Sequence, residues 1–263
     1  MRKIVILLLF LSISLIAYSD MDLDGVEDSE DKCPNTPLSD LVDLNGCTIE
    51  SLISNHHFNI SIGEIYTKDS DSKVYTSSVR FNYFYKDSFS LTLSSSSYNR
   101  KDNGIDSNGL NDTYLFGFYS IKPIKNLRIK SGVGISFPTY DSRGNRLDYS
   151  FSSYFTYAID RLSIIGGAGY RVVRDRDLDG YLEHQNSFSY NIGFGYYLLD
   201  SFYSSLSYSN SNSIYKGYSD IESISIYNYF KIDKNWFLNL SYTRGLNSMA
   251  VDSSLGVRVG YYW

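Results

Sequence analysis

The chain has 263 residues, with 24 basic against 29 acidic side chains and a net charge of −5 at neutral pH. Hydrophobic residues make up 43% of it, and 26 Tyr and 15 Phe supply much of that share. Beyond residue 19 no stretch is apolar for long enough to form a transmembrane helix. The acidic balance gives no reason to expect a nucleic-acid partner.

Residues 1–19 have the three parts of a secretory signal peptide. Arg2 and Lys3 form a basic start, residues 4–16 are apolar, and residues 17–19 (Ala-Tyr-Ser) give a small-x-small cleavage pattern. The apolar run is short for a membrane span. We therefore expect cleavage after Ser19, with an uncleaved N-terminal anchor as the alternative.

An Asp-rich segment follows the signal peptide. Acidic side chains stand at positions 1, 3, 5, 9 and 12 of a twelve-residue stretch that has Gly25 at position 6. Ca²⁺ takes six to eight hard oxygen ligands, and Gly permits the sharp turn that aims them inward; position 7 usually supplies a backbone carbonyl. The expected calcium ligands are Asp20, Asp22, Asp24, Val26, Asp28 and Asp31. No amphipathic helices flank the segment, so it is not an EF-hand.

Two further motifs follow at once, Cys33-Pro-Asn-Thr-Pro and Asp43-Leu-Asn-Gly-Cys47. With them, residues 20–47 resemble a thrombospondin type-3 repeat of the kind found in OmpA-like proteins. The resemblance implies that the Asp residues bind calcium and that Cys33 pairs with Cys47. OmpA-like proteins commonly place this repeat between a barrel and a peptidoglycan-binding domain. Here it precedes the strand-rich region, so cell-wall anchoring is not implied. A disordered acidic leader is the alternative.

The charge divides the chain into two parts after the signal peptide. Residues 20–50 carry ten acidic side chains and one Lys, a net of −9, whereas residues 51–263 carry a net of +2. We therefore expect three segments. They are a signal peptide over 1–19, a small irregular module stabilised by calcium and a disulfide over 20–50, and a main domain over 51–263.

The main domain repeats one pattern, in which aromatic and aliphatic residues alternate with Ser, Gly, Asn and Thr. A period of two predicts strands with one apolar face and one polar face. We predict twelve strands, with ten or fourteen as alternatives, because residues 94–100 and 112–121 are poorly phased. Their ranges are 58–66, 73–85, 88–98, 112–121, 126–137, 146–159, 162–173, 186–198, 202–210, 221–232, 236–243 and 254–263.

The connections between these strands alternate in length. Tight turns near 86–87, 122–125, 160–161, 200–201 and 233–234 are separated by longer segments, among them 99–111, 138–145 and 174–185. Outer-membrane barrels have short periplasmic turns and long external loops. The pattern thus predicts an all-β, antiparallel transmembrane barrel of about twelve strands, with both barrel ends and the Asp-rich module in the periplasm. A soluble sandwich or a β-solenoid is the alternative.

The last strand supports the barrel most directly. Leu255, Val257, Val259, Tyr261 and Trp263 alternate with small or polar residues, and the final residue is aromatic. In a barrel such a strand pairs with the first strand, turns its apolar face to lipid and places its aromatic in the interfacial girdle. The expected partners are outer-membrane lipid, the barrel-assembly machinery acting on this strand, and a periplasmic protein docking on the module.

The opposite, polar face of the strands carries more basic than acidic residues. We expect the lumen to be lined by Arg80, Arg128, Lys130, Asp148, Arg171, Lys231 and Arg258. A wet lumen with this balance favours anions. The predicted function is a narrow porin or channel for small solutes with a slight anion preference. If instead the charges pair across a plugged lumen, the barrel is structural or adhesive.

A second Asp-rich segment lies in the predicted loop over 174–185. Asp175, Asp177, Asp179 and Glu183 repeat the calcium-loop spacing there. The alternative is a solvated charged loop in which Arg174 and Arg176 neutralise the acids.

No enzyme is expected, because the three His residues, His56, His57 and His184, are not accompanied by a nucleophile motif.

Overall fold

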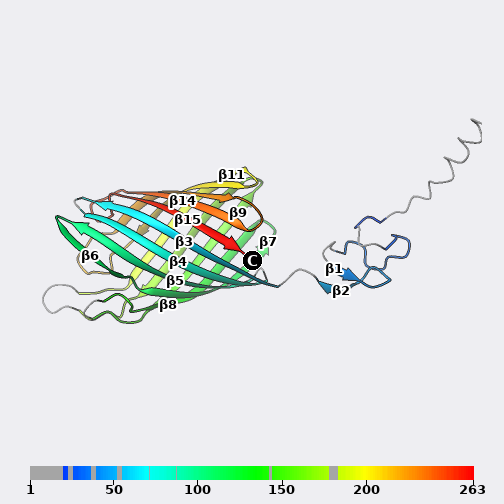
Figure 1. The fold of residues 1–263 in the computed structure, drawn as a ribbon, viewed down its shortest axis with the longest axis horizontal. Helices are drawn as coiled ribbons and strands as arrows, with labels where there is room; N and C mark the ends of the chain where they lie inside the picture. The colour runs from blue at the N-terminus through cyan, green and yellow to red at the C-terminus, as the bar shows by residue number, and fades with distance from the viewer. Residues whose placement is uncertain are drawn as a thin grey trace, which may run out of the picture. The chain divides into compact units, whose positions relative to one another are not determined.

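The computed structural model describes residues 20–22, 26–36, 40–51, 55–70, 72–86, 88–141, 144–177 and 183–263. The chain divides into two compact units, Met1–Asn55 and His56–Trp263, and each is described by itself (Figure 1). The expected signal peptide lies outside the described residues, as do Asp24 and Asp179. Within the described ranges, no helix is long and apolar enough to cross a membrane.

The N-terminal unit is held by a short hairpin and one disulfide. Strands β1 (Asp40–Val42) and β2 (Thr48–Ser51) pair antiparallel, and Cys33 is bonded to Cys47. The hydroxyl of the buried Thr36 donates to the carbonyls of Cys33 and Gly46, at 2.8 and 2.7 Å. The disulfide confirms the pairing expected from the sequence. The Thr36 hydroxyl is a second link between the segment around Cys33 and the segment around Cys47.

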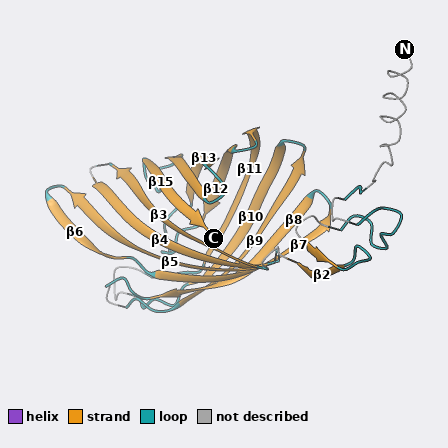
Figure 2. Cartoon of the chain, turned by 45° about the vertical axis from the view of Figure 1, so that its right-hand side comes forward, coloured by secondary structure: helices purple, strands orange, loops and turns teal. Residues whose placement is uncertain are grey.

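The second unit is a closed antiparallel barrel of twelve strands, as predicted (Figure 2). Each strand pairs with the next in sequence, and β15 closes the barrel against β3. The strands are β3 (His56–Asp69), β4 (Ser72–Tyr85), β5 (Phe89–Asp102), β7 (Thr113–Ile124), β8 (Leu127–Phe137), β9 (Asp148–Ile159), β10 (Leu162–Val172), β11 (Ser187–Leu199), β12 (Phe202–Ser211), β13 (Ile221–Lys231), β14 (Trp236–Gly245) and β15 (Ser253–Tyr262).

The closing seam has the partners expected from the sequence. The backbones of Phe58 and Trp263 exchange two N–H···O hydrogen bonds of 3.1 Å, and their rings stack with centroids 5.7 Å apart. Register continues from Tyr262 opposite Asn59 up to Ser253 opposite Lys68. The seam is thus as fully hydrogen-bonded as the other strand pairs.

One element departs from the prediction. The segment 99–111 was expected to be a loop, but it forms the upper part of β5 and a further strand, β6 (Ile105–Leu110). Asn103 and Gly104 make the turn between them with φ of +47° and +84°, as two-residue hairpins of type I′ require. β6 and β7 both pair with β5, separated only by Asn111 and Asp112. The prediction therefore assigned too much of this connection to irregular structure, because most of residues 99–111 form a strand hairpin.

The barrel carries its apolar residues on the outside. In β11, Phe188, Ile192 and Phe194 are each at least half exposed, at 50, 56 and 55%. Of the side chains that the structure describes, Phe237 and Ala250 are the only buried apolar ones. Soluble proteins rarely expose apolar surface so widely. The arrangement suits a barrel whose outer face meets hydrocarbon and whose inner face is polar.

Both ends of the barrel chain lie at the same rim. The short turns near residues 86–88, 125–126, 160–161, 200–201 and 232–235 occur at this rim, together with the start of β3 and the end of β15. The longer connections, including 138–147, 173–186 and 212–220, occur at the opposite rim. We call these the short-turn rim and the long-loop rim.

Candidate functional site

The inner face of the barrel holds the residues predicted to line a lumen. Strand register places Arg80, Arg128, Lys130, Asp148, Arg171 and Arg258 on this face, in phase with small polar residues, and Lys231 follows the same phase at the end of β13. Six of them fall into three groups, Arg80 with Arg258, Arg128 with Lys130, and Asp148 with Arg171, and Lys231 stands apart. Of the three groups, only Asp148 with Arg171 is an ion pair.

Arg258 lies across the closing seam. Its guanidinium donates to the Ser78 hydroxyl at 2.9 Å and to the Ser61 hydroxyl at 3.4 Å. These bonds link β15 to β3 and β4. Gly63 makes room for them, because a Cβ on that residue would crowd the Arg258 side chain at 3.1 Å. Arg80 stands opposite Ser61 in the register, so the two guanidinium groups share one part of the wall.

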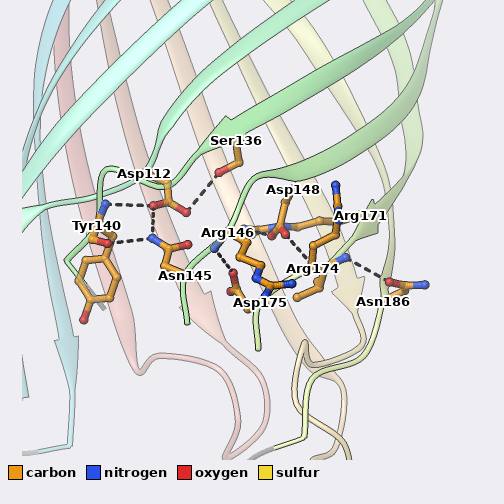
Figure 3. Close-up of polar contacts among 11 residues, drawn as sticks. Asp112, Ser136, Tyr140, Asn145, Arg146, Asp148, Arg171, Arg174, Asp175 and Asn186 are labelled. Carbon is orange, nitrogen blue, oxygen red and sulfur yellow. Dashed lines mark hydrogen bonds and ion pairs between the residues drawn. The ribbon is translucent and has the colours of Figure 1, made fainter. Parts of the chain in front are cut away.

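Asp148 and Arg171 form a buried ion pair near the long-loop rim (Figure 3). The Asp148 side chain is only 1% exposed, and its Oδ2 accepts hydrogen bonds from Arg171 at 2.8 and 2.9 Å. Its Oδ1 accepts the backbone N–H of Arg174 at 2.7 Å. Both predicted lumen residues are therefore engaged with each other, and the carboxylate also fixes the start of the loop that follows β10.

Asp112 is a second carboxylate at this rim, and the sequence reasoning missed it. It accepts hydrogen bonds from the Asn145 amide at 2.8 Å, the Tyr140 backbone at 3.1 Å and the Ser136 hydroxyl at 3.2 Å (Figure 3). It thus anchors the loop over 138–147. No run of acidic residues marks it in the sequence, because it acts alone at the break between β6 and β7.

The two anchored loops also bind each other. Asp175 accepts the backbone N–H of Arg146 at 2.8 Å (Figure 3). The N–H of Arg176 donates to the Gly144 carbonyl at 3.0 Å. The loops that follow β8 and β10 are therefore one connected structure at the long-loop rim.

The described acids of the second Asp-rich segment have separate partners. Asp175 binds Arg146, Asp177 accepts the His184 N–H at 2.6 Å, and Glu183 pairs with Lys216 at 2.9 Å. The hydrogen bond from His184 lowers the pKa of Asp177, and the bond to Glu183 raises the pKa of Lys216. Asp179 lies outside the described residues. Calcium binding by this loop stays a prediction.

The acidic module has one feature that fits a cation. Asp22 Oδ2 accepts the Thr36 N–H at 2.6 Å, whereas its Oδ1 is buried and has no hydrogen-bond partner. A buried carboxylate oxygen left without a partner is costly unless a cation binds it. Asp28 and Asp31 each accept one backbone N–H, from Met21 and Cys33. Among the described residues, no group of three or more His, Cys, Asp or Glu is placed to hold a metal, and Asp24 is not among them.

A row of aromatic rings runs along the inner face of β7. Tyr114, Phe116 and Phe118 follow one another with centroids 6.4 and 5.8 Å apart, and their planes differ by only 22° and 12°. All three are half-buried. The Lys130 ammonium lies 4.5 Å from the Phe118 ring centroid, a cation–π contact. The sequence analysis did not assign these rings to the lumen.

Glycines on the neighbouring strand make room for these rings. Gly134 and Gly132 of β8 stand opposite Phe116 and Phe118 in the register, and a Cβ on either would overlap the facing ring. The rings therefore lean across β8 and lie against the wall, as in the pairing of aromatics with strand glycines.

Three further pairs have the same arrangement, Tyr154 over Gly167, Tyr203 over Gly195 and Phe237 over Gly260. These aromatic residues could have been predicted to line the wall from one sequence signal, an inward Gly beside an inward aromatic on the next strand.

No protein family and no curated protein sequence matches this chain. Solved structures with a similar fold exist at low sequence identity. An outer-membrane channel from Pseudomonas putida F1 aligns with a TM-score of 0.61 and 12% identity, covering 79% of this chain and 95% of that one. The NanC porin aligns with a TM-score of 0.56 and 14% identity, covering 77% and 98%.

The translocator domain of the autotransporter NalP from Neisseria meningitidis aligns with a TM-score of 0.52 and 9% identity, covering 80% of this chain and 88% of that one. At these identities the likeness concerns the fold alone. The chain has the closed antiparallel β-barrel fold that is found in outer-membrane channels and translocators.

Proposed function

We propose that this protein is an outer-membrane channel for small solutes, with a slight preference for anions and a periplasmic calcium-binding module. The observation that carries the proposal is the closed twelve-stranded barrel, which is apolar outside and lined inside by small polar and basic side chains. Twelve strands fall between the filled eight-stranded barrels and the open sixteen-stranded porins. Two of the similar structures are an outer-membrane channel and a porin. No enzymatic activity is part of the proposal.

The balance of lumen charges supports the anion preference. Asp148 is neutralised by Arg171, which leaves Arg80, Arg128, Lys130, Lys231 and Arg258 as basic groups in the inward phase. Cationic groups along a pore raise the local concentration of anions and exclude cations.

Single-channel recording in planar bilayers tests this function. The full mature chain in a KCl gradient is expected to give discrete conductance steps and a reversal potential shifted toward that of chloride. Arg258→Gln removes one lumen charge and is expected to reduce the shift, whereas Arg100→Gln, which removes an exposed cation paired with Asp102, leaves it unchanged. A silent bilayer with correctly folded protein would favour a structural or adhesive barrel.

The N-terminal unit is proposed to bind calcium in the periplasm through Asp20, Asp22, Asp24, Asp28, Asp31 and the Val26 carbonyl. The orphan Oδ1 of Asp22 is the structural feature that supports this. Bound calcium would neutralise the mutual repulsion of these carboxylates and order the segment before Cys33. Such a module suits a spacer or a docking point for a periplasmic protein.

Limited proteolysis tests the module. A chelator is expected to expose residues 20–50 to protease while the barrel keeps its heat-modifiable migration on gels. Terbium titration of Asp22→Asn should show weakened binding, and Glu30→Gln, an exposed acid of the same unit outside the proposed ligands, should not. A leader that stays resistant in chelator would contradict calcium as its organiser. An Asp177→Ala variant in the same titration tests the second loop.

A further inference from the structure

A cavity of about 480 Å³ lies inside the short-turn rim. Its walls come from the starts of β3, β5 and β8, the ends of β4, β7 and β15, and the turn between β13 and β14. Its lining includes Lys86, Ser90, Ser120, Arg128, Lys130 and Lys234. A solute that crosses the barrel under the function proposed above passes through this cavity.

The charge of this lining is one-sided. Lys86, Arg128, Lys130 and Lys234 contribute four cations, and no Asp or Glu occurs among the described lining residues. Asp233, next in sequence to Lys234, turns its Oδ1 to the backbone N–H groups of Asn235 and Trp236, both at 2.7 Å. Asp87 lies outside the described residues. A cleft lined by charges of one sign focuses the field and concentrates the opposite ion.

The cations are held at different depths. Arg128 and Lys130 project from the wall of β8, with Lys130 fixed over the Phe118 ring, while Lys86 and Lys234 belong to two turns at the rim. The Ser90 and Ser120 side chains line the same space. Hydroxyl and ammonium donors converging on one volume make charge-assisted hydrogen bonds to an oxyanion.

We propose that this cavity is a saturable binding site for a compact dianionic oxygen group, such as phosphate or a short dicarboxylate. A dianion with several oxygens can neutralise two of the four cations at once, whereas chloride can neutralise only one. The inference rests on the proposed channel function and deepens it, because it assigns the solute a charge class and places its binding step at the short-turn rim.

Phosphate titration of the channel tests the site. The full mature chain in planar bilayers, with KCl on both sides, is expected to lose conductance as inorganic phosphate is added, and the loss should saturate. The effect should be stronger from one side, the one that the short-turn rim faces. Succinate is the second probe. If both anions reduce the conductance, the site selects its ligand by charge. If phosphate alone does so, the site selects a tetrahedral arrangement of oxygens.

A matched pair of double variants locates the site. Arg128→Gln with Lys130→Gln is expected to raise the phosphate concentration for half-block about tenfold or more, since two charge-assisted contacts are lost. Lys68→Gln with Lys73→Gln removes two cations that face each other at the opposite rim, and it should leave the half-block concentration unchanged. Heat-modifiable migration on gels verifies that both variants fold.

The outcomes separate the site from the channel. Conductance steps with no saturable phosphate effect, or with equal half-block in both double variants, overturn the site and leave the channel standing. Absent steps contradict the channel instead. In that case phosphorus NMR line broadening by the detergent-refolded chain decides the site. Broadening that is lost in Arg128→Gln with Lys130→Gln supports it, and equal or absent broadening overturns it.

Discussion

At the scale of single residues, the inner wall depends on pairs of aromatic side chains and glycines. Phe116 and Phe118 lie over Gly134 and Gly132 because those positions carry no Cβ. The rings are thereby kept against the wall and out of the centre of the barrel. The bore of this barrel is set by where glycines stand as much as by the number of its strands.

Gly134→Val should therefore narrow the channel. The new side chain overlaps the Phe116 ring, which must turn toward the lumen, so conductance should fall and stability should drop by about 1–3 kcal/mol. Single-channel conductance and denaturant unfolding measure the two effects. Gly117→Val is the control, because a Cβ there meets only a Leu91 methyl, at 3.4 Å. Unchanged conductance in Gly134→Val would mean that the ring does not border the conduction path.

At the scale of the elements, two carboxylates hold the long loops. Asp148 fixes the start of the loop after β10, and Asp112 fixes the loop after β8. Each satisfies backbone or amide donors in the described part of its loop, where a buried donor without a partner would be costly.

Asp148→Asn should loosen the long-loop rim. The substitution leaves the Arg171 guanidinium without its carboxylate, and breaking such a buried pair costs about 3 kcal/mol. We expect lower resistance to denaturant and noisier open-channel current. Asp102→Asn, which breaks an exposed pair with Arg100, should change neither, because exposed pairs contribute little. If the open-channel current of Asp148→Asn is no noisier than that of the wild type, the ion pair does not control the order of the loop.

The contact between Asp177 and His184 should survive mild acid. The His184 N–H lowers the pKa of Asp177 from its ordinary value of 3.8 in the folded state. A lowered pKa stabilises the fold above that value and loses its contribution as pH falls through the folded pKa. The side-chain carboxylate resonance of Asp177 is thus expected to titrate only below pH 3.8. A carboxylate transition of Asp177 above pH 3.8 would contradict this assignment.

The strands could be predicted because one face of most of them is apolar and the other is not. β11 shows this, with Phe188, Ile192 and Phe194 outside. β7 was ambiguous in phase because both faces are apolar, with Leu115 and Tyr119 outside and Phe116 inside. β6 was missed because its residues do not alternate, although Asn103-Gly104 is a hairpin signal.

The lumen charges could be placed by phase, but their pairing could not. Nothing in the sequence indicates that Asp148 meets Arg171, or that Arg258 binds serines of two other strands, because these contacts depend on strand register. The sequence likewise did not indicate that Asp177 accepts the His184 N–H or that Glu183 pairs with Lys216.

At the scale of the whole molecule, the two rims should face different compartments. Both native cysteines form the disulfide, so an introduced cysteine is the only free thiol. On intact cells, a membrane-impermeant maleimide should label Ser107→Cys in the β5–β6 hairpin and spare Ser201→Cys in a short turn. Both serines are exposed, so accessibility at the protein surface is matched. Labelling of Ser201→Cys alone would invert the proposed orientation.

The pairing of Phe58 with Trp263 also fixes the order of events during biogenesis. The backbone partners of the first barrel strand belong to the last barrel strand, which is synthesised after the other barrel strands. Until the last strand is present, the sheet has two free edges, one at β3 and one at the most recently added strand. Each edge has a row of unpaired backbone groups and is prone to aggregation. Closing the longest loop in the barrel sequence is the final and entropically most costly step. A chain arrested a few residues early would therefore be an open sheet that needs a chaperone, rather than a slightly smaller barrel.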